Sequence, residues 1–209
     1  MSALTPVGLG FRAGRGGSVV VAVAADGSGV RVVRSTYLAT AAEGDRLAYE
    51  PYHVAYEMPR RPDGEISAEA AAAVAEGRRR QVALAPKALR SLVASLADAG
   101  YEPVRAALLI NRAGWMTDLL GHALSAPEHP PVIEGLAVRV ALRAAFTETG
   151  LAFIELDEKS LLETVSIQLP LPPGGIDAQL KALGAGVGPP WRKEQKQACL
   201  AAWLALAAR

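Results

Sequence analysis

The sequence predicts an α/β fold with one mixed β-sheet and helices on both of its faces. Three strand-like segments follow one another in the first 58 residues, two more lie further on between helical segments, and hydrophobic residues make up 51% of the 209 residues. Consecutive strands with short connections pair antiparallel, whereas strands joined through a helix pair parallel by a right-handed crossover. We therefore expect five strands, three antiparallel and then two parallel.

The first three strands are expected in the N-terminal part of the chain. Residues 19–25 form a continuous apolar run, residues 30–38 are rich in β-branched side chains, and an Asp-Gly pair between them is typical of a hairpin turn. A third, weaker strand is predicted at residues 52–58. Residues 1–17 contain glycines but no preceding strand, so they are interpreted as a flexible lead-in and not as a phosphate-binding loop.

Helices alternate with strands in the rest of the chain. Ser67 is a suitable N-cap for a helix that ends near residue 99, and Pro86 should kink or break that helix. Residues 104–110 are apolar without alternation, which is typical of a strand covered on both faces. Because no linker separates two cores, residues 18–209 are predicted to form a single domain. A last strand is expected at residues 151–156 and further helices near residues 115–124, 133–149, 176–183 and 191–208, while residues 161–169 fit either a helix or a strand.

The composition excludes several classes of protein. Lys and Arg number 22 against 21 Asp and Glu, which gives a net charge of +1 and excludes a globally basic nucleic-acid binder. The single cysteine, Cys199, excludes an intramolecular disulfide framework. The sequence has no apolar run of about 18 residues and no signal-peptide pattern, so no membrane span is expected and the cytoplasm is the expected location.

The order of elements resembles the ribonuclease H-like superfold, which also contains Holliday-junction resolvases and actin-like ATPases. The short stretch Asp26-Gly27-Ser28 after an apolar strand adds to this resemblance. Residues 10–12 (Gly-Phe-Arg) and 188–191 (Gly-Pro-Pro-Trp), ahead of an amphipathic end helix, are similar to segments of a bacterial protein family within the superfold. This second resemblance implies the fold and no particular activity.

The resemblance implies a two-metal nuclease site, in which carboxylates hold Mg²⁺ against a phosphodiester. These carboxylates come from the first strand, the end of the fourth strand or the first helix, and the start of the last helix. Asp26 and Glu194 are therefore the candidate catalytic residues. A hairpin turn is the more common role of an Asp before Gly, and a helix N-terminus explains Glu194 without catalysis. Asn111 and Arg112 stand at the end of the fourth predicted strand, where the pattern implies an acid.

Several arginines are candidates for binding an anion or nucleic-acid phosphates. Arg112 follows a strand end, and Arg78, Arg79 and Arg80 form a run on a predicted helix. A solvated helix face is the more common explanation of such a run. Four tyrosines in the N-terminal half could stack on bases or pack across strands; they are Tyr37, Tyr49, Tyr52 and Tyr56.

Two functions follow as hypotheses. The first is a nucleic-acid-related protein with a degenerate or absent two-metal site, which would use Mg²⁺ as a phosphodiester hydrolase only if Asp26, a residue near Asn111, and Glu194 converge. The second is a non-catalytic interaction or assembly module, with a homo-oligomer as one expected form. It would use the edge of the third predicted strand with Tyr52, Tyr56 and Met58. Because Asn111 and Arg112 stand where the resemblance implies an acid, the sequence favours a protein that is not an enzyme.

Overall fold

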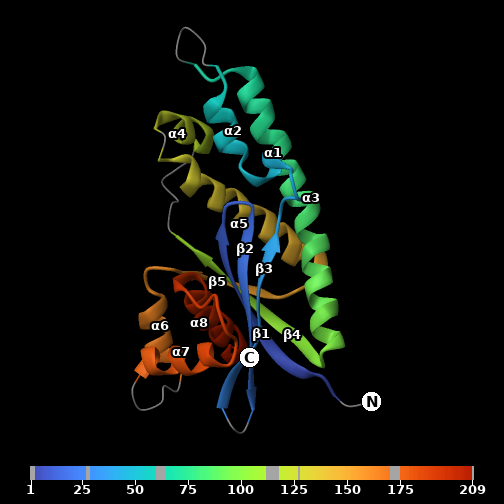
Figure 1. Ribbon diagram of the computed structural model, residues 1–209, viewed down its shortest axis with the longest axis vertical. Helices are drawn as coiled ribbons and strands as arrows, with labels where there is room; N and C mark the ends of the chain where they lie inside the picture. The colour runs from blue at the N-terminus through green and yellow to red at the C-terminus, as the bar shows by residue number, and fades with distance from the viewer. Residues whose placement is uncertain are drawn as a thin grey trace.

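The chain folds into one five-stranded mixed sheet with helices against both faces, as Figure 1 shows. The computed structural model describes residues 3–26, 29–59, 65–111, 118–126, 128–169 and 175–208. The sheet order is β3-β2-β1-β4-β5, in which β1 pairs antiparallel with β2 and parallel with β4. These pairings confirm the predicted mixed sheet. The strands are β1 (Thr5–Gly14), β2 (Gly17–Asp26), β3 (Gly29–Ala39), β4 (Tyr101–Ile110) and β5 (Phe153–Asp157).

The identity of two elements differs from the sequence prediction. The glycine-containing segment interpreted as a flexible lead-in forms β1, which is the central strand of the sheet. The third predicted strand, residues 52–58, lies almost entirely in helix α2 (Pro51–Glu57). Pro51 occupies the first turn, where a missing N–H costs nothing, and the buried residues Tyr52 and Ala55 are three positions apart, which is a helical spacing. The hairpin of β2 and β3 is confirmed.

Seven further helices lie among the described residues. The longest, α3, begins after Ser67, whose Oγ accepts a hydrogen bond from the Ala70 N–H at 3.1 Å. It continues through Pro86, so the expected break is absent; the neighbouring Ala85 and Leu89 are fully buried and keep this part of α3 in the core. The helices are α1 (Arg46–Tyr49), α3 (Ala68–Asp98), α4 (Leu119–Ser125), α5 (Pro130–Thr149), α6 (Leu161–Gln168), α7 (Gly175–Ala185) and α8 (Lys193–Ala207).

Strand β1 separates two apolar layers. Its side chains at Leu9 and Phe11 pack with α3 and α5 on one face, while Gly8 and Gly10 face α8 on the other. A Cβ on Gly10 would overlap the carbonyl oxygen of Ala198, so α8 lies directly on the backbone of β1. Since Ala202 lies over Gly8 and Ala198 over Gly10, α8 runs antiparallel to β1 and begins near the carboxyl end of the strand.

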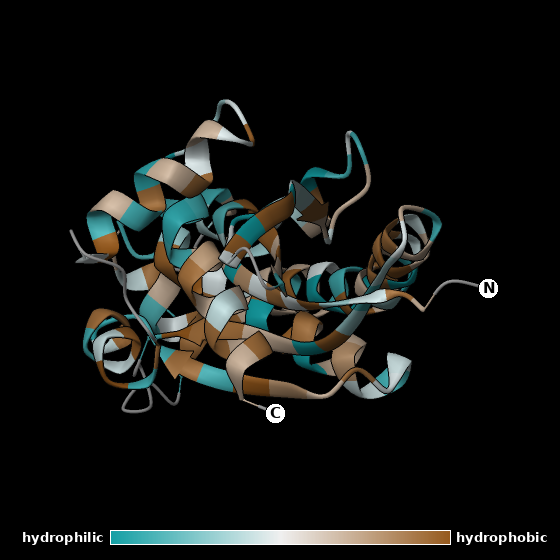
Figure 2. Cartoon of the chain, turned by 90° about the horizontal axis from the view of Figure 1, so that it is seen from below, coloured by the Kyte–Doolittle hydropathy of each residue, from teal (hydrophilic) through white to brown (hydrophobic). Residues whose placement is uncertain are grey.

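The hydrophobic positions follow this layered arrangement. Figure 2 shows brown and teal positions alternating along most helices, as expected where one side of each helix is buried. A third apolar cluster, centred on Tyr52 and Ile133, joins α2 and α4 to the N-terminal half of α5. Among the described helices, none is both long and apolar enough to cross a membrane.

Candidate functional site

A polar cluster lies at the carboxyl end of the parallel strands, which is the edge where sites of open α/β sheets form. Arg12 stands near the end of β1, Asn111 directly follows β4, and Glu158 directly follows β5. Arg139 of α5 and Gln197 of α8 reach the same edge from the two covering layers. We call these five residues the Arg12 cluster.

Both arginines of the Arg12 cluster bind neighbouring side chains. The Arg12 Nε donates a hydrogen bond to the Gln197 Oε1 at 2.8 Å, and its Nη2 lies 3.8 Å from the Glu158 Oε2. The Arg139 Nη2 donates to the Glu158 Oε1 at 3.1 Å, and its Nη1 donates to the Asn111 Oδ1. The Glu158 carboxylate therefore lies between two guanidinium groups.

The backbone fixes the geometry of the Arg12 cluster. The Arg139 Nε donates to the carbonyl oxygen of Leu109 on β4 at 3.0 Å, and the N–H of Glu158 donates to the carbonyl oxygen of Ile110 at 2.8 Å. The Arg139 side chain is only 6% exposed. Burial lowers the pKa of Arg139 from its usual value, and the charge of Glu158 acts against that change. With two guanidinium groups and one carboxylate, the cluster carries one net positive charge.

The two candidate catalytic residues are not brought together. The register places Ala24 opposite Val7, so Asp26 lies level with Thr5, whereas Asn111 lies level with Gly14. Nine residues of extended strand separate these levels, which is roughly 30 Å. The expected convergence of Asp26 with the region of Asn111 is therefore wrong.

Each of the two acids has its own setting in the fold. Asp26 ends β2, where its Oδ2 accepts a hydrogen bond from the Arg31 Nε at 3.4 Å. Glu194 lies in the first turn of α8, one turn before Gln197, on the side of the molecule that holds the Arg12 cluster. Asp26 does not reach this edge because it ends the second strand of the sheet. The first strand is β1, and its polar residue at this edge is Arg12.

The predicted anion-binding arginines do not join the Arg12 cluster. Arg79 and Arg80 of α3 both donate to the Glu76 carboxylate at 2.7–2.8 Å, and Arg80 also reaches Asp45 at 3.1 Å. Arg78 contacts the hydroxyl of Tyr52 and counteracts the rise in the pKa of that hydroxyl that burial causes. Arg112 lies outside the described residues.

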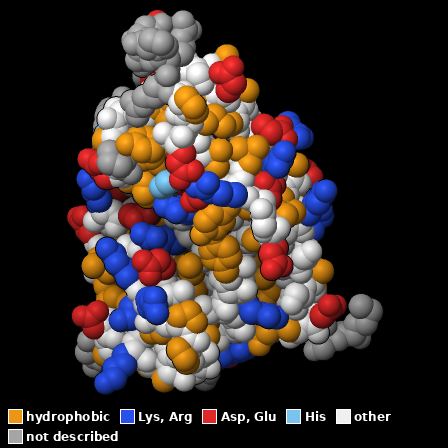
Figure 3. Space-filling view, turned by 45° about the horizontal axis from the view of Figure 1, so that its top comes forward, with side chains coloured by type: hydrophobic (Ala, Val, Ile, Leu, Met, Phe, Trp, Pro, Cys, Tyr) orange, Lys and Arg blue, Asp and Glu red, His pale blue; other side chains and the backbone are white. Residues whose placement is uncertain are grey.

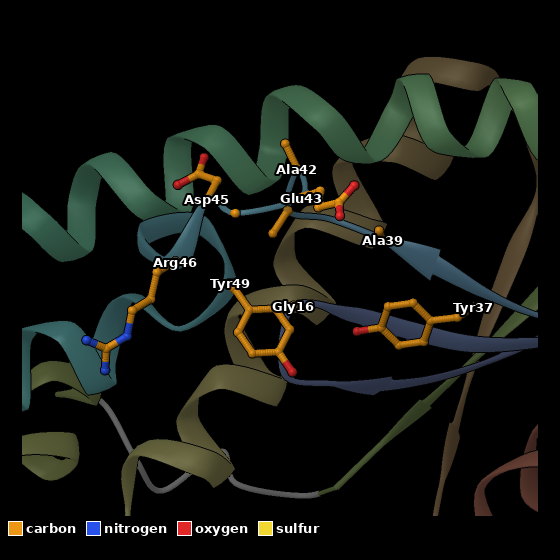
Figure 4. A pocket seen from close by; sticks show the side chains of 10 residues that line it. Gly16, Tyr37, Ala39, Ala42, Glu43, Asp45, Arg46 and Tyr49 are labelled. Atoms are coloured by element: carbon orange, nitrogen blue, oxygen red, sulfur yellow. The ribbon is translucent and has the colours of Figure 1, made fainter.

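The tyrosines form no single platform. Tyr52 is fully buried, and Tyr56 and Met58 are half-buried in the third apolar cluster, so the exposed strand edge predicted at these three residues is not formed. Tyr37 and Tyr49 are exposed and lie on either side of Gly16 beside a pocket of ≈440 Å³, as Figure 4 shows. The Tyr37 hydroxyl donates to the carbonyl oxygen of Arg15 at 2.7 Å, which holds this ring against the β1–β2 turn.

The Arg12 cluster does not fit a magnesium site. Mg²⁺ requires several oxygen ligands in octahedral geometry, usually including carboxylates. Glu158 is the one carboxylate in the cluster, and Arg139 and Arg12 already occupy its two oxygens. In the described ranges of the chain, no group of three or more His, Cys, Asp or Glu side chains could hold a metal ion.

Comparison with known proteins shows the fold. No protein-family model and no curated protein matches the sequence. The structure of RuvC from Thermus thermophilus matches with a TM-score of 0.51 at 11% sequence identity, over 94% of this chain and 90% of that one. The fold is ribonuclease H-like.

Two other solved structures with the ribonuclease H-like fold are also similar to this chain. T. thermophilus RuvC in complex with a Holliday junction substrate matches with a TM-score of 0.48 at 10% identity, over 96% of this chain and 91% of that one. The yeast mitochondrial Holliday junction resolvase Ydc2 matches with a TM-score of 0.42 at 11% identity, over 99% of this chain and 83% of that one.

The Arg12 cluster lies at two of the places where the sequence resemblance implied carboxylates. Arg12 stands on the first strand and Asn111 follows the fourth, whereas the start of the last helix carries the acid Glu194, one turn before Gln197. The sequence did not identify four of the site residues, which are Arg12, Arg139, Glu158 and Gln197. For Arg12 a signal was present: Gly8, Gly10 and Arg12 are spaced by two, and glycines at this spacing in a strand indicate close contact with a helix.

Proposed function

We propose that the protein binds nucleic acid through its ribonuclease H-like fold without hydrolysing it. The observation that carries the proposal is the guanidinium of Arg12 on the first strand, hydrogen-bonded to Gln197 in place of a carboxylate. A positive charge at this position disfavours a divalent cation, whereas a guanidinium is well suited to a phosphate oxygen. The loss of metal chemistry and the gain of an anion contact thus have the same cause.

Exposed cations around the same edge support a phosphate-bearing ligand. Lys159 follows Glu158, and Arg192, Lys193 and Lys196 surround the start of α8; all four are exposed. Figure 3 shows Lys and Arg side chains gathered on one side of the molecule, interspersed with Asp and Glu. A local group of cations is sufficient for contacts with a phosphate backbone even where the net charge of the chain is only +1.

Binding and cleavage are tested on the same labelled DNA. We expect fluorescence anisotropy to detect binding of a duplex or a four-way junction at low salt, and the affinity to fall as salt rises because counterions are released. The double variant Lys193→Glu, Lys196→Glu should weaken binding by about tenfold or more, because it reverses the charge of two side chains that would contact phosphates. Lys87→Glu on α3, on the opposite face of the sheet, is the matched control.

The same samples, incubated with Mg²⁺ or Mn²⁺, should show intact DNA on a denaturing gel. Metal-dependent cleavage that Glu158→Gln abolishes would contradict the non-hydrolytic part of the proposal. Equal binding by the double variant and by Lys87→Glu, or no binding of any DNA form, would contradict the nucleic-acid part.

The second candidate function is a non-catalytic protein-interaction module. The observation that favours it is the edge strand β3, which pairs only with β2 in the described sheet. The partner is either a different protein or a second copy of this chain, and light scattering after size-exclusion chromatography across a range of protein concentrations distinguishes the two.

A further inference from the structure

Strand β3 offers a long edge of the sheet for pairing. It extends over 11 residues, Gly29–Ala39, and its one hydrogen-bonded neighbour among the described strands is β2. Every second backbone N–H and C=O of β3 therefore points away from the sheet. A strand edge of this length is a ready template for another extended chain.

Helix α3 runs beside this edge and forms a groove with it. In Figure 1, α3 passes alongside β3, and it packs with α5 on one face of the sheet. The pocket between them has a volume of ≈400 Å³. Its α3 wall consists of side chains three or four positions apart, which places them on one stripe of the helix. The lining residues that the argument uses are Arg34, Thr36 and Leu38 of β3 and Leu84, Ala88 and Ser91 of α3.

The shape of the groove suits small side chains of an added strand. Arg34, Thr36 and Leu38 are spaced by two, and their partners across β2 are alternate residues of one face, so they all face α3. On the helix, Ala88 and Ser91 have short side chains, which leave the groove open between the two elements. A strand paired outside β3 would direct every second side chain into this space.

The charge of the groove selects an acidic ligand. Arg34 donates a hydrogen bond to the neutral Ser95 Oγ at 3.0 Å and has no carboxylate partner among the described residues. Neither Asp nor Glu is among the residues that line this pocket. Arg34 is therefore a cation without an acidic partner inside a groove that carries no negative charge.

We infer that the groove between β3 and α3 binds an extended, acidic segment of a partner protein. The segment pairs with β3 as a sixth strand, directs small apolar side chains toward Leu84 and Ala88, and places a carboxylate on Arg34. Main-chain hydrogen bonds to β3 supply affinity, and the groove supplies selectivity. This surface shares no residue with the Arg12 cluster, so it does not depend on the nucleic-acid proposal.

A second copy of this chain is a poorer occupant of the same edge. Arg34 is the central residue of β3, so symmetric antiparallel pairing of two β3 strands would place the two Arg34 side chains opposite each other. Like charges directly opposite one another destabilise a strand pair. Nucleic acid is also disfavoured, because the neighbouring Arg79 and Arg80 are already paired with Glu76.

The test begins with displayed random ten-residue peptides, selected on the intact protein and counter-selected on the Arg34→Glu variant. We expect enriched peptides to alternate β-branched or small residues and to share one Asp or Glu. The synthetic consensus peptide, labelled with fluorescein, should lose about tenfold or more in affinity for Arg34→Glu and for Ser91→Arg, and bind Lys181→Glu on α7 like the unchanged protein. A peptide with Lys in place of the shared acid should regain affinity for Arg34→Glu.

Hydrogen exchange provides the independent readout. The bound consensus peptide should protect the outward-facing amides of β3 from exchange, because they become hydrogen-bonded. The inference is overturned if no acidic extended consensus emerges, if the peptide binds Arg34→Glu and Ser91→Arg like the unchanged protein, or if the protected amides lie elsewhere. It is also overturned if Arg34→Glu instead abolishes a concentration-dependent dimer or the binding of single-stranded DNA.

Discussion

Two glycines show how closely residue choice is tied to packing in this protein. Gly8 and Gly10 look like flexible positions in the sequence, yet both lie in the central strand under α8. The helix backbone occupies the space that a Cβ would need, with Ala202 over Gly8 and Ala198 over Gly10. Absence of a side chain, and not backbone freedom, is therefore what these positions require.

Replacing Gly10 should destabilise the protein strongly. We expect Gly10→Ala to lower the free energy of unfolding by about 3 kcal/mol, because the new methyl group meets the rigid backbone of α8. Gly14→Ala, at the end of the same strand, is the matched control, since a Cβ there has no heavy atom within 4 Å. Urea denaturation of the two variants checks this; equal midpoints would show that α8 does not press on β1.

Glu134 is a buried acid whose carboxylate holds helix α2 in place. Its Oε1 accepts hydrogen bonds from the backbone N–H groups of Tyr52 at 2.8 Å and His53 at 3.1 Å, while its Oε2 is buried without a hydrogen-bond partner. Burial raises the pKa of Glu134 to about 7, against the opposing effect of the two backbone hydrogen bonds. The folded protein thus holds this proton at a pH where the unfolded chain has released it.

This pKa predicts a pH dependence of stability. Because the folded pKa lies above the unfolded value, the contribution of Glu134 is fully present below about pH 4.5 and is lost as the pH rises through about 7. The loss should be on the order of 2–3 kcal/mol. Denaturant midpoints measured from pH 5 to about 8 should therefore decline more steeply for the unchanged protein than for Glu134→Gln. Parallel curves would contradict the raised pKa.

At the scale of elements, short segments were the hardest to predict. Residues 52–58 contain two tyrosines and a valine, which favours a strand, yet Pro51 and the third apolar cluster make the segment a helix. The hairpin of β2 and β3 was predicted correctly because an Asp-Gly pair and two long apolar runs agree with each other. A short segment can be predicted from its local sequence where several features, such as a turn pair and flanking apolar runs, indicate the same structure. Where only residue propensity indicates a structure, tertiary contacts can override it.

Helix α5 is attached to the sheet edge by one buried arginine and one exposed arginine. Arg139 binds Glu158, Asn111 and the Leu109 carbonyl and is nearly fully buried, whereas Arg143, one turn later, pairs with Glu155 near the surface. We expect Arg139→Ala to lower the free energy of unfolding by about 3–5 kcal/mol, because it leaves Glu158 without its closest partner. Arg143→Ala should cost at most about 1 kcal/mol, as exposed ion pairs do.

Thermal and urea unfolding of both variants checks the comparison. A loss for Arg139→Ala as small as that for Arg143→Ala would show that the Arg12 cluster does not contribute to stability. Arg139→Lys is a useful third variant, since an ammonium group keeps the charge but cannot reproduce the three directed hydrogen bonds of the guanidinium.

At the scale of the whole molecule, the sheet assembles a site from segments far apart in the sequence. β1, α5 and α8 each supply one residue of the Arg12 cluster, and the other two directly follow β4 and β5; one of the five is a carboxylate. A native state that bound a divalent ion at a hundred times its Kd would gain about 2.7 kcal/mol. We expect no rise in unfolding temperature with Mg²⁺ or Mn²⁺. A rise in unfolding temperature that Glu158→Gln abolishes would contradict the conclusion that the Arg12 cluster does not fit a magnesium site.

The class of fold follows from the sequence, because the order of strand-like and helical segments, the right-handed crossover and short antiparallel connections leave few arrangements. The departure of Asn111 from a nuclease pattern is likewise visible in the sequence. The identity of the central strand follows only from the folded protein, since Gly8 and Gly10 are required by contact with α8 at the other end of the chain. Because β1 is the first strand of the sheet, the first-strand residue at the site is Arg12 and not Asp26, and Asp26 lies far from the end of β4. Contacts between residues distant in sequence carry this information; the local pattern of Gly8, Gly10 and Arg12 indicates only that a helix lies close to the strand.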